Sequence, residues 1–337
     1  MFKRTLPSLA VFALAPAAYA AETQVPFAYA WSYLGPTAPF FVASDNGHFA
    51  NAGIELDMHT GNGSVGTVEQ VASGTHPLGF ADINALIDYH SQNPEAPVKA
   101  VMMLFDRPAY GVLGLKSLGV SEPEDVVGRT VGIPPSDAAG AQFPVFANVN
   151  DIQIDSVTVE PVTFSEREQL LANGDVDAIT GFTSTSYFNL LGLGVPEEDI
   201  SVVSMADHGL DLYGNAIIVN TDFADANPET VEGFLHAFSE GLRDTIDAPI
   251  AAVESVFARN PDIDPELEQK RLDYVLNNYI LTDFTRENGV GGIDHDRFAR
   301  AVEQLQVANI NIEDTNPETY FTDSYMPNGP VMITITQ

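Results

Sequence analysis

Three short apolar runs between Phe27 and Asn84 constrain the fold more than any other feature of the chain. The runs are 27–31, 54–59 and 78–81, and polar or glycine-rich residues follow each one before a helical pattern near 37–49, 65–73 and 83–90. Strands that alternate with helices favour a parallel sheet. Ligands of such sheets bind beyond the carboxyl ends of the strands, where these three loops lie. We therefore interpret the stretch as one half of a binding cleft.

The same alternation continues through the middle of the chain and then gives way to helices. Further strands are expected at 98–104, 111–115, 129–133, 157–162, 176–180, 201–204 and 214–220, and an edge strand at 332–336. Helices are expected at 121–128 with Ser121 as the N-cap, at 138–143 where Pro144 should kink or end the helix, and at 165–172 with a Ser165/Glu168 capping box. Others are expected at 249–258, 265–276 and 296–308, and from Pro228 onward the chain is mainly helical. We expect an α/β fold of two lobes joined by crossings at 111–115 and 214–220, with lobe 1 formed by 21–111 and 215–337 and lobe 2 by 112–214.

The first twenty residues have the pattern of a cleaved signal peptide. Lys3 and Arg4 precede a short apolar run at 6–14, and Ala18-Tyr19-Ala20 matches a cleavage site. The alternative, a membrane anchor, would need a run of about 20 apolar residues. The chain has no cysteine, so it has neither a disulfide framework nor a lipid-anchor thiol. We expect the mature protein in the periplasm.

The net charge of −33 excludes several classes of partner. Nucleic acids and anionic lipids are bound by patches of Lys and Arg, which are scarce in this chain. A saline habitat is the favoured explanation, because salt screens the self-repulsion of so acidic a protein. A merely acidic surface without that adaptation is the alternative.

The loop 61–66 matches G-x-G-x-x-G, follows a predicted strand and opens a helix. With Asp82 at the end of the next strand, it has the form of a dinucleotide fingerprint, and an exported oxidoreductase is one alternative. In a broader interpretation, the free backbone N–H groups at this helix start bind a polar or anionic group of another ligand. A tight turn that binds nothing is the third possibility.

Aromatic and polar side chains gather at the predicted strand ends, as in sites for small planar ligands. Arg107 is the one basic residue on a predicted cleft loop, and it could pair either with a ligand or with a neighbouring acid. The histidines show no spacing typical of metal ligands, and no catalytic triad or cofactor site is expected. The candidate ligand-binding residues are Trp31, Ser32, Tyr33, Thr37, Gly63, Ser64, Val65, Asp82, Asn84, Phe105, Arg107, Tyr110, Asp137, Phe182, Thr183 and Tyr213.

The order of several motifs resembles the periplasmic solute-binding proteins of ABC importers in the sulfonate, nitrate and thiamine-pyrimidine class. These motifs are Trp31, APFFVA at 38–43, NGHF at 46–49, AGI at 52–54, GNGS at 61–64, VASG at 71–74, PEDVVGRTVG at 123–132, NGDVDA at 173–178, YGN at 213–215 and NPETV at 227–231. The resemblance covers nearly the whole mature chain. It implies the two-lobed type II binding-protein fold, with a mixed, mostly parallel sheet in each lobe and two crossing strands as the hinge.

The resemblance also implies a function. A monomeric, non-enzymatic receptor would capture a small molecule between its lobes and deliver it to an ABC transporter permease. One relative of this class is a pyrimidine-forming enzyme with a Cys-rich motif, which this chain lacks. Sulfonate and nitrate receptors are expected to place cations or many donors in the cleft, where only Arg107 is evident. An aromatic, acid-bearing cleft fits a heterocycle such as a thiamine pyrimidine precursor better.

Overall fold

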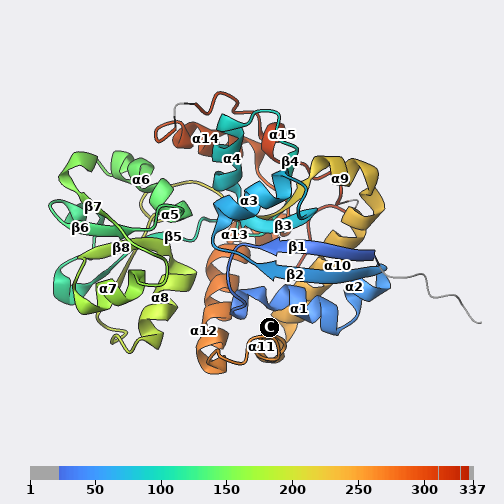
Figure 1. The fold of residues 1–337 in the computed structure, drawn as a ribbon, viewed down its shortest axis with the longest axis horizontal. Coiled ribbons are helices and arrows are strands. Elements are labelled where there is room, and N and C mark those ends of the chain that lie inside the picture. The colour runs from blue at the N-terminus through green and yellow to red at the C-terminus, as the bar shows by residue number, and fades with distance from the viewer. Residues whose placement is uncertain (1–22, 310, 327, 334–337) are drawn as a thin grey trace, which may run out of the picture.

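The computed structural model describes residues 23–309, 311–326 and 328–333, which form two lobes side by side (Figure 1). The predicted signal peptide and residues 334–336 of the predicted C-terminal strand lie outside the described residues. Each lobe contains one five-stranded mixed sheet flanked by helices, as expected for the α/β binding-protein fold.

The first sheet has the strand order β2-β1-β3-β10-β4. Its strands are β1 (Thr23–Tyr29), β2 (Ile54–Thr60), β3 (Leu78–Asp82), β4 (Val98–Met103) and β10 (Asn215–Asn220). Strand β1 runs parallel to β2 and β3, whereas β10 runs antiparallel to β3 and β4. The carboxyl ends of β1, β2 and β3 therefore lie at one edge of the sheet.

The second sheet repeats this arrangement with the order β7-β6-β8-β5-β9. Its strands are β5 (Tyr110–Leu115), β6 (Thr130–Ile133), β7 (Thr158–Pro161), β8 (Ala178–Phe182) and β9 (Ile200–Ser204). Strand β6 runs parallel to β7 and β8, and β5 runs antiparallel to β8 and β9. In each sheet, the antiparallel strand is the one that the chain enters directly after it crosses between lobes. The crossings are residues 104–109, before β5, and 205–214, before β10. The segments predicted as crossings, 111–115 and 214–220, instead form the strands β5 and β10 that the chain enters after each crossing.

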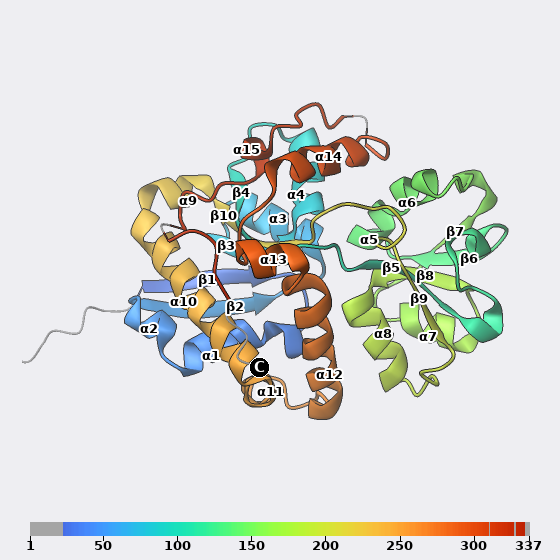
Figure 2. The same ribbon diagram turned by 180° about the vertical axis from the view of Figure 1, so that it is seen from behind.

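The helices divide between the lobes in the same way (Figure 2). Around the first sheet lie α1 (Ala38–Asp45), α2 (His48–Asn51), α3 (Ser64–Ala72), α4 (Ile83–Gln92), α9 (Thr221–Ala226), α10 (Pro228–Asp247), α11 (Pro249–Phe257), α12 (Pro265–Val275), α13 (Asp283–Asn288), α14 (His295–Leu305) and α15 (Pro317–Tyr320). Around the second lie α5 (Ala138–Ala141), α6 (Phe143–Val149), α7 (Arg167–Asn173) and α8 (Thr183–Gly192). No helix in the described part of the chain is long and apolar enough to cross a membrane.

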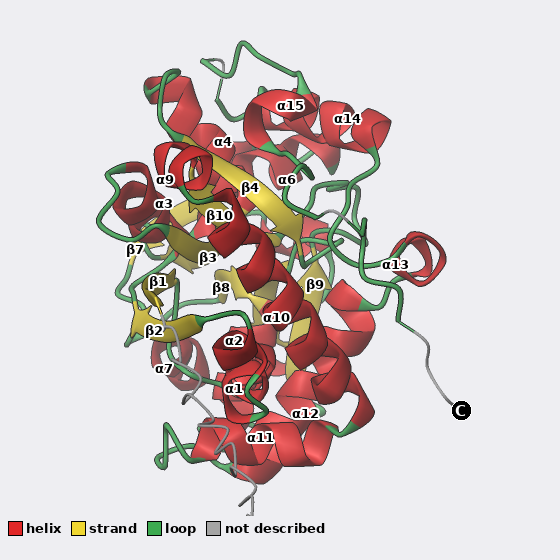
Figure 3. Ribbon diagram, turned by 90° about the vertical axis from the view of Figure 1, so that its right-hand side faces the viewer, coloured by secondary structure: helices red, strands yellow, loops and turns green. Residues whose placement is uncertain are grey.

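Aromatic packing fixes one face of the first sheet against the helices that cover it. The ring of Phe27 on β1 lies 5.0 Å from that of Phe40 on α1 and 5.3 Å from that of Phe234 on α10, centroid to centroid. These rings are almost fully buried, and burial of such large apolar surfaces is the main stabilising contribution of a core. Figure 3 shows the long helix α10 and the neighbouring α1 beside this sheet.

Three predicted helices differ from the structure for local reasons. The helix expected at 37–49 is two helices, because Gly47 adopts a left-handed conformation (φ 77°) between α1 and α2. The segment 121–128 forms only a 3-10 turn at Pro123–Val126, with Glu122 rather than Ser121 at its N-cap. Pro144 stands in the first turn of α6, after the short α5, so it starts a helix there.

Candidate functional site

A cleft between the two lobes encloses about 780 Å³ of empty space, including space open to solvent at its mouth. Loops at the carboxyl ends of the parallel strands form much of its wall, as the fold class leads one to expect. The first lobe contributes Tyr29, Ala30, Trp31, Ser32, Leu34, Pro36, Gly63, Ser64, Phe80, Phe105, Asn215 and Arg271, and the second contributes Ser136, Asp137, Ala138, Phe164, Arg167, Phe182, Ser184 and Thr185.

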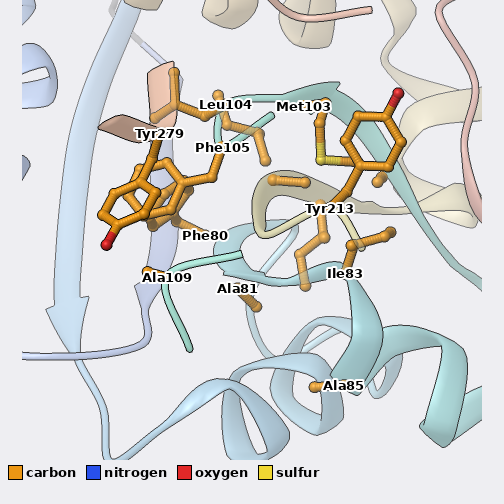
Figure 4. Packing of buried hydrophobic residues seen from close by; sticks show 14 of the residues in the cluster. Phe80, Ala81, Ile83, Ala85, Met103, Leu104, Phe105, Ala109, Tyr213 and Tyr279 are labelled. Atoms are coloured by element: carbon orange, nitrogen blue, oxygen red, sulfur yellow. The ribbon is translucent and has the colours of Figure 1, made fainter. Parts of the chain in front are cut away.

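Aromatic rings line the cleft from both sides. Trp31, just after β1, meets Phe164 of the second lobe edge to face, with 5.2 Å between ring centroids. Phe80 and Phe105 also line the cleft and belong to the buried cluster that Figure 4 shows, with their centroids 5.9 Å apart. Such rings offer flat apolar surfaces on which a planar ligand can stack.

The two lobes lie close together at Gly63. This residue has φ 104°, a conformation that L side chains rarely adopt, and it is the N-cap of α3. A Cβ atom at this position would lie 3.5 Å from the backbone oxygen of Ser136 in the other lobe. Such a Cβ atom would make only an ordinary contact, so the positive φ rather than a lack of space favours glycine where the loop before α3 meets the second lobe.

Two buried guanidinium groups also line the cleft, and both are paired with carboxylates. Arg167 donates to Oε1 of Glu168 at 2.6 Å and to Oγ of Ser186 at 2.8 Å. Asp137 lies on the other side, with its Oδ1 3.8 Å from Nη1 of Arg167. Burial raises the pKa of the Asp137 carboxyl, and the charge of Arg167 opposes that shift.

Arg271 on α12 is paired in the same manner. Its Nε lies 2.9 Å from Oε2 and 3.0 Å from Oε1 of Glu268, one turn earlier on the helix. Its Nη1 donates to the backbone oxygens of Ser184 at 2.7 Å and Thr185 at 3.1 Å, both on α8 of the second lobe. The cleft thus contains two cations whose charges are already neutralised by protein acids.

A buried polar network closes the cleft on the side of the crossings. Oδ1 of Asp82 accepts hydrogen bonds from Tyr110 at 2.5 Å and from the backbone and side-chain nitrogens of Asn84 at 2.8 and 3.0 Å. The bond from the backbone nitrogen of Asn84 makes Asp82 the N-cap of α4. Burial raises the pKa of Asp82 to about 6, against the effect of these hydrogen bonds. Asn84 also donates to the backbone oxygen of Tyr213 at 2.7 Å, which ties the second crossing to the first lobe.

The structure brings together one group of the predicted site residues and leaves the others elsewhere. Those that line the cleft are Trp31, Ser32, Gly63, Ser64, Phe105, Asp137 and Phe182. Those buried behind its wall are Thr37, Asp82, Asn84, Tyr110, Thr183 and Tyr213. Tyr33 and Val65 also lie outside the lining; the Tyr33 hydroxyl donates to the backbone oxygen of Met58, and Val65 is exposed.

Arg107 lies outside the cleft and pairs with Asp207. The sequence left two partners open for Arg107, a ligand or a protein acid, and the structure shows the acid. The basic residues that do line the cleft, Arg167 and Arg271, were not among the sequence candidates. Arg167 lies in a segment predicted to begin with a Ser165/Glu168 capping box, but α7 begins two residues later and Glu168 pairs with Arg167 instead.

Other lining residues that the sequence did not single out are Phe164 and Asn215. Asn215 stands in the YGN motif that contributed to the family resemblance, which was the one available signal for it. Among the described residues, no group of three or more His, Asp or Glu side chains is arranged to hold a metal ion.

Comparison with known proteins assigns the chain to a family. The model of the NMT1/THI5-like family matches residues 36–252, which is more than half of the chain. The chain belongs to this family. The matched region of this NMT1/THI5-like protein includes the loops after β2 and β3, all of the second lobe and Asn215, but it begins after Trp31.

Relatives of this NMT1/THI5-like protein have names of two kinds. The riboflavin-binding protein RibY of Chloroflexus aurantiacus is 26% identical over 334 residues, covering 96% of this chain and 92% of the relative. The formylaminopyrimidine-binding protein of Halalkalibacterium halodurans is 23% identical, with 79% of each chain covered. The 4-amino-5-hydroxymethyl-2-methylpyrimidine phosphate synthase of Aspergillus parasiticus is also 23% identical, over 73% of this chain and 74% of its own.

Solved structures agree on the fold. The alkanesulfonate-binding protein SsuA of Xanthomonas axonopodis pv. citri superposes with a TM-score of 0.68 at 12% identity, covering 90% of this chain and all (100%) of that one. At this identity the likeness establishes the two-lobed binding-protein fold.

Proposed function

We propose that this protein is an extracytoplasmic receptor that captures a small planar aromatic heterocycle between its lobes and delivers it to an ABC transporter permease. The observation that carries the proposal is the composition of the cleft, in which aromatic rings from both lobes surround a few polar groups. A pyrimidine, such as a thiamine precursor, or a flavin has the flat shape that such a cleft accepts. The names of the riboflavin-binding and formylaminopyrimidine-binding relatives support this class of ligand.

The pairing of both cleft arginines argues against a sulfonate, taurine or nitrate as the ligand. An anion is bound best by donors that have no other anionic partner. Arg167 and Arg271 each have a carboxylate oxygen within 2.9 Å, and Asp137 adds a further acid to the cleft wall. A bound anion would lie close to these acids and would be repelled by them.

We propose a receptor without catalytic activity or cofactor. The alternative oxidoreductase would use Asp82 to bind the ribose of a dinucleotide, but the ionisable oxygens of Asp82 are buried and Oδ1 already accepts hydrogen bonds from Tyr110 and Asn84. The absence of cysteine from the sequence argues against the chemistry of the synthase-named relatives. Export through the signal peptide at 1–20 and a monomeric state complete the proposal.

Titration of the protein with a panel of compounds tests the proposal. The panel comprises riboflavin, 4-amino-5-hydroxymethyl-2-methylpyrimidine, taurine, nitrate and NAD, with thermal unfolding as the readout. A ligand present at 100 times its Kd stabilises the folded state by about 2.7 kcal/mol, so binding raises Tm. We expect a rise with at least one heterocycle. A rise with taurine or nitrate alone would replace the proposal with an anion receptor, and a rise with NAD alone would replace it with the dinucleotide enzyme.

Trp31 provides a second readout, because it is the only tryptophan of the chain. A heterocycle that stacks in the cleft should quench or shift its fluorescence saturably. Trp31→Ala should weaken binding, measured by calorimetry, by about ten-fold, or 1.4 kcal/mol. Arg107→Ala, outside the cleft, is the control and should leave the affinity unchanged. If a bound heterocycle leaves both emission and the affinity of Trp31→Ala unaltered, the ligand does not occupy this cleft.

A further inference from the structure

One polar side chain of the cleft wall has a buried oxygen that meets no hydrogen-bond donor in the described part of the chain. Asn215, at the start of β10, lines the cleft and is 6% exposed. Its side-chain oxygen has no partner among the described residues. A buried amide without its hydrogen bonds destabilises a folded protein, so its presence in a native structure calls for an explanation. Elsewhere in the first lobe, the buried Asn84 and Asn220 donate hydrogen bonds to protein acceptors.

The backbone holds Asn215 firmly at the edge of the cleft. Its carbonyl oxygen accepts from the backbone nitrogens of Leu104 at 3.0 Å and Phe105 at 2.9 Å. On the other side, β10 pairs antiparallel with β3, where Asn215 stands opposite Asp82. A side chain on so constrained a backbone is positioned before any ligand arrives, as a recognition group must be.

A second polar group lies beside the same strand pair. Oγ of Ser64, which also lines the cleft and is 5% exposed, accepts a hydrogen bond from the backbone nitrogen of Asp82 at 3.0 Å. That bond uses the hydroxyl oxygen as acceptor and leaves the hydroxyl proton available to an acceptor in the cleft. Ser64 is the first residue of the nine-residue helix α3, whose free N–H groups favour an electron-rich ligand atom at this end.

We propose that Asn215, assisted by Ser64, forms hydrogen bonds to one edge of the ligand's ring, where an N–H donor lies next to an acceptor. The carboxamide of Asn215 presents one acceptor and one donor, and a half-turn of the amide only exchanges their positions. An edge of this kind, either a cyclic amide or imide or an aminopyrimidine, satisfies both and can take a further hydrogen bond from Ser64. The inference rests on the proposed heterocycle receptor and adds the hydrogen-bonding pattern that the ligand must have.

Matched pairs of probes test the inference on the unaltered protein. The imide pair is riboflavin and N3-methylriboflavin, and the aminopyrimidine pair is a 4-aminopyrimidine and its 4-dimethylamino analogue. Methylation removes the N–H donor while keeping the ring system. We expect the methylated member of the recognised pair to bind about 100-fold more weakly, since a site built to hydrogen-bond a group rejects its analogue strongly. The pair that discriminates identifies the type of edge.

Variants connect that preference to the two residues. Asn215→Leu, of similar size, should raise Tm by removing an unsatisfied amide, yet lower the affinity for the N–H probe about ten-fold and reduce its preference over the methylated probe. Ser64→Ala should weaken binding of both members of a pair. Asn173→Leu, exposed at the end of α7, is the matched control and should change neither.

The outcomes separate this inference from the proposed function. If the heterocycles of both pairs bind but methylation and Asn215→Leu have no effect, the inference is wrong and the receptor proposal stands. If no heterocycle binds while taurine or nitrate does, the proposed function is wrong. A failure of Asn215→Leu to fold would leave the probe pairs as the deciding measurement.

Discussion

Asp82 is an acid that the fold holds in an almost solvent-free position. Its Oδ1 joins Tyr110 of the second sheet to the start of α4, and its Oδ2 has no partner among the described residues. Burial raises its pKa to about 6, so the folded protein retains a proton that the unfolded chain releases near pH 4. Below about pH 6, the neutral Asp82 also removes one negative charge from the region behind the cleft wall.

A stability measurement across pH tests this state. Between about pH 4 and 6, the folded state binds this proton and the unfolded state does not, so the contribution of Asp82 to stability falls as pH rises, by roughly 3 kcal/mol in all. Asp82→Asn keeps an oxygen to cap α4 and cannot ionise. The stability of this variant relative to wild type should therefore increase from pH 4 to 6 and then level off, in urea unfolding experiments.

The control for that experiment is Asp207→Asn. The side-chain hydrogen bond from Arg107 lowers the pKa of Asp207, so this carboxyl is ionised in both folded and unfolded protein above pH 5. The difference in the free energy of unfolding between Asp207→Asn and wild type should therefore be constant between pH 5 and 7. A constant difference for Asp82→Asn across pH 4 to 6 would mean that Asp82 is ionised in the folded protein.

Also at the residue scale, the sequence predicted which loops form the cleft more accurately than which side chains of these loops point into it. Loop position after a strand identified Trp31, Gly63, Ser64 and Phe105, because strand ends can be read from apolar runs. It also selected Asp82 and Tyr110, which turn away from the cleft and bond each other. The direction in which a side chain points depends on its contacts with the other lobe, and no local sequence pattern predicts those contacts. Arg271 lies on a helix far along the chain, so its approach to the cleft required the tertiary structure.

Helix α12 contributes contacts between the lobes outside the two crossings (Figure 2). Glu268 accepts a hydrogen bond from the backbone nitrogen of Gly35 in the first lobe at 2.7 Å, and Arg271 donates to the backbone of α8 in the second. The two side chains are 3% exposed and form a pair one turn apart. Breaking a buried pair leaves an uncompensated charge, whereas replacing both members does not.

Substitutions on α12 test the role of this pair. Arg271→Ala should lower the free energy of unfolding by about 3–5 kcal/mol, because Glu268 remains buried and charged. The double variant Glu268→Gln with Arg271→Met, which fills similar space without charge, should recover most of that loss in urea unfolding. Arg243→Ala, half-buried in a helical pair with Glu240, is the control and should cost less than about 1 kcal/mol. A double variant no more stable than Arg271→Ala would show that the charges themselves stabilise the helix.

The order and type of the strands could be predicted from the sequence because their apolar runs are short and bounded by turn residues. The ten strands of the two sheets all overlap predicted runs, although β1 begins four residues before the predicted Phe27. The helix expected at 37–49 failed at Gly47, where one left-handed residue divides it. The pairing of strands across the crossings, and so the antiparallel places of β5 and β10, depends on contacts between distant segments and could not be read from periodicity.

At the scale of the whole molecule, two lobes share a cleft in a chain of net charge −33. Like charges distributed over both lobes repel each other within the folded state, and unfolding increases the distances between them. Arg167 and Arg271 are paired with buried acids, so their positive charges do not offset the negative charge of the surface acids. Stability should depend on how strongly the solvent screens the remaining charge.

Salt should therefore stabilise the protein. The screening length falls from about 30 Å at 0.01 M to about 3 Å at 1 M salt, so most of the repulsion disappears within this range. We expect Tm to rise by several degrees, chiefly below about 0.5 M NaCl, where screening changes most. Exclusion of salt from the protein surface would instead continue to raise Tm at higher salt concentration. Sucrose does not screen charges, so it would reproduce only the rise in Tm that exclusion causes.

A charge-reduced variant provides the decisive comparison. Asp155, Glu160, Glu254 and Glu303 are exposed, so changing them together to Asn or Gln removes four negative charges with little effect on packing. This variant should melt at a higher temperature than wild type in 0.01 M NaCl, and the gap should close as NaCl increases. A Tm that is constant or falls with NaCl in wild type would exclude surface repulsion as a limit on its stability, and a gap that persists at 1 M would assign the variant's gain to local effects of the substitutions.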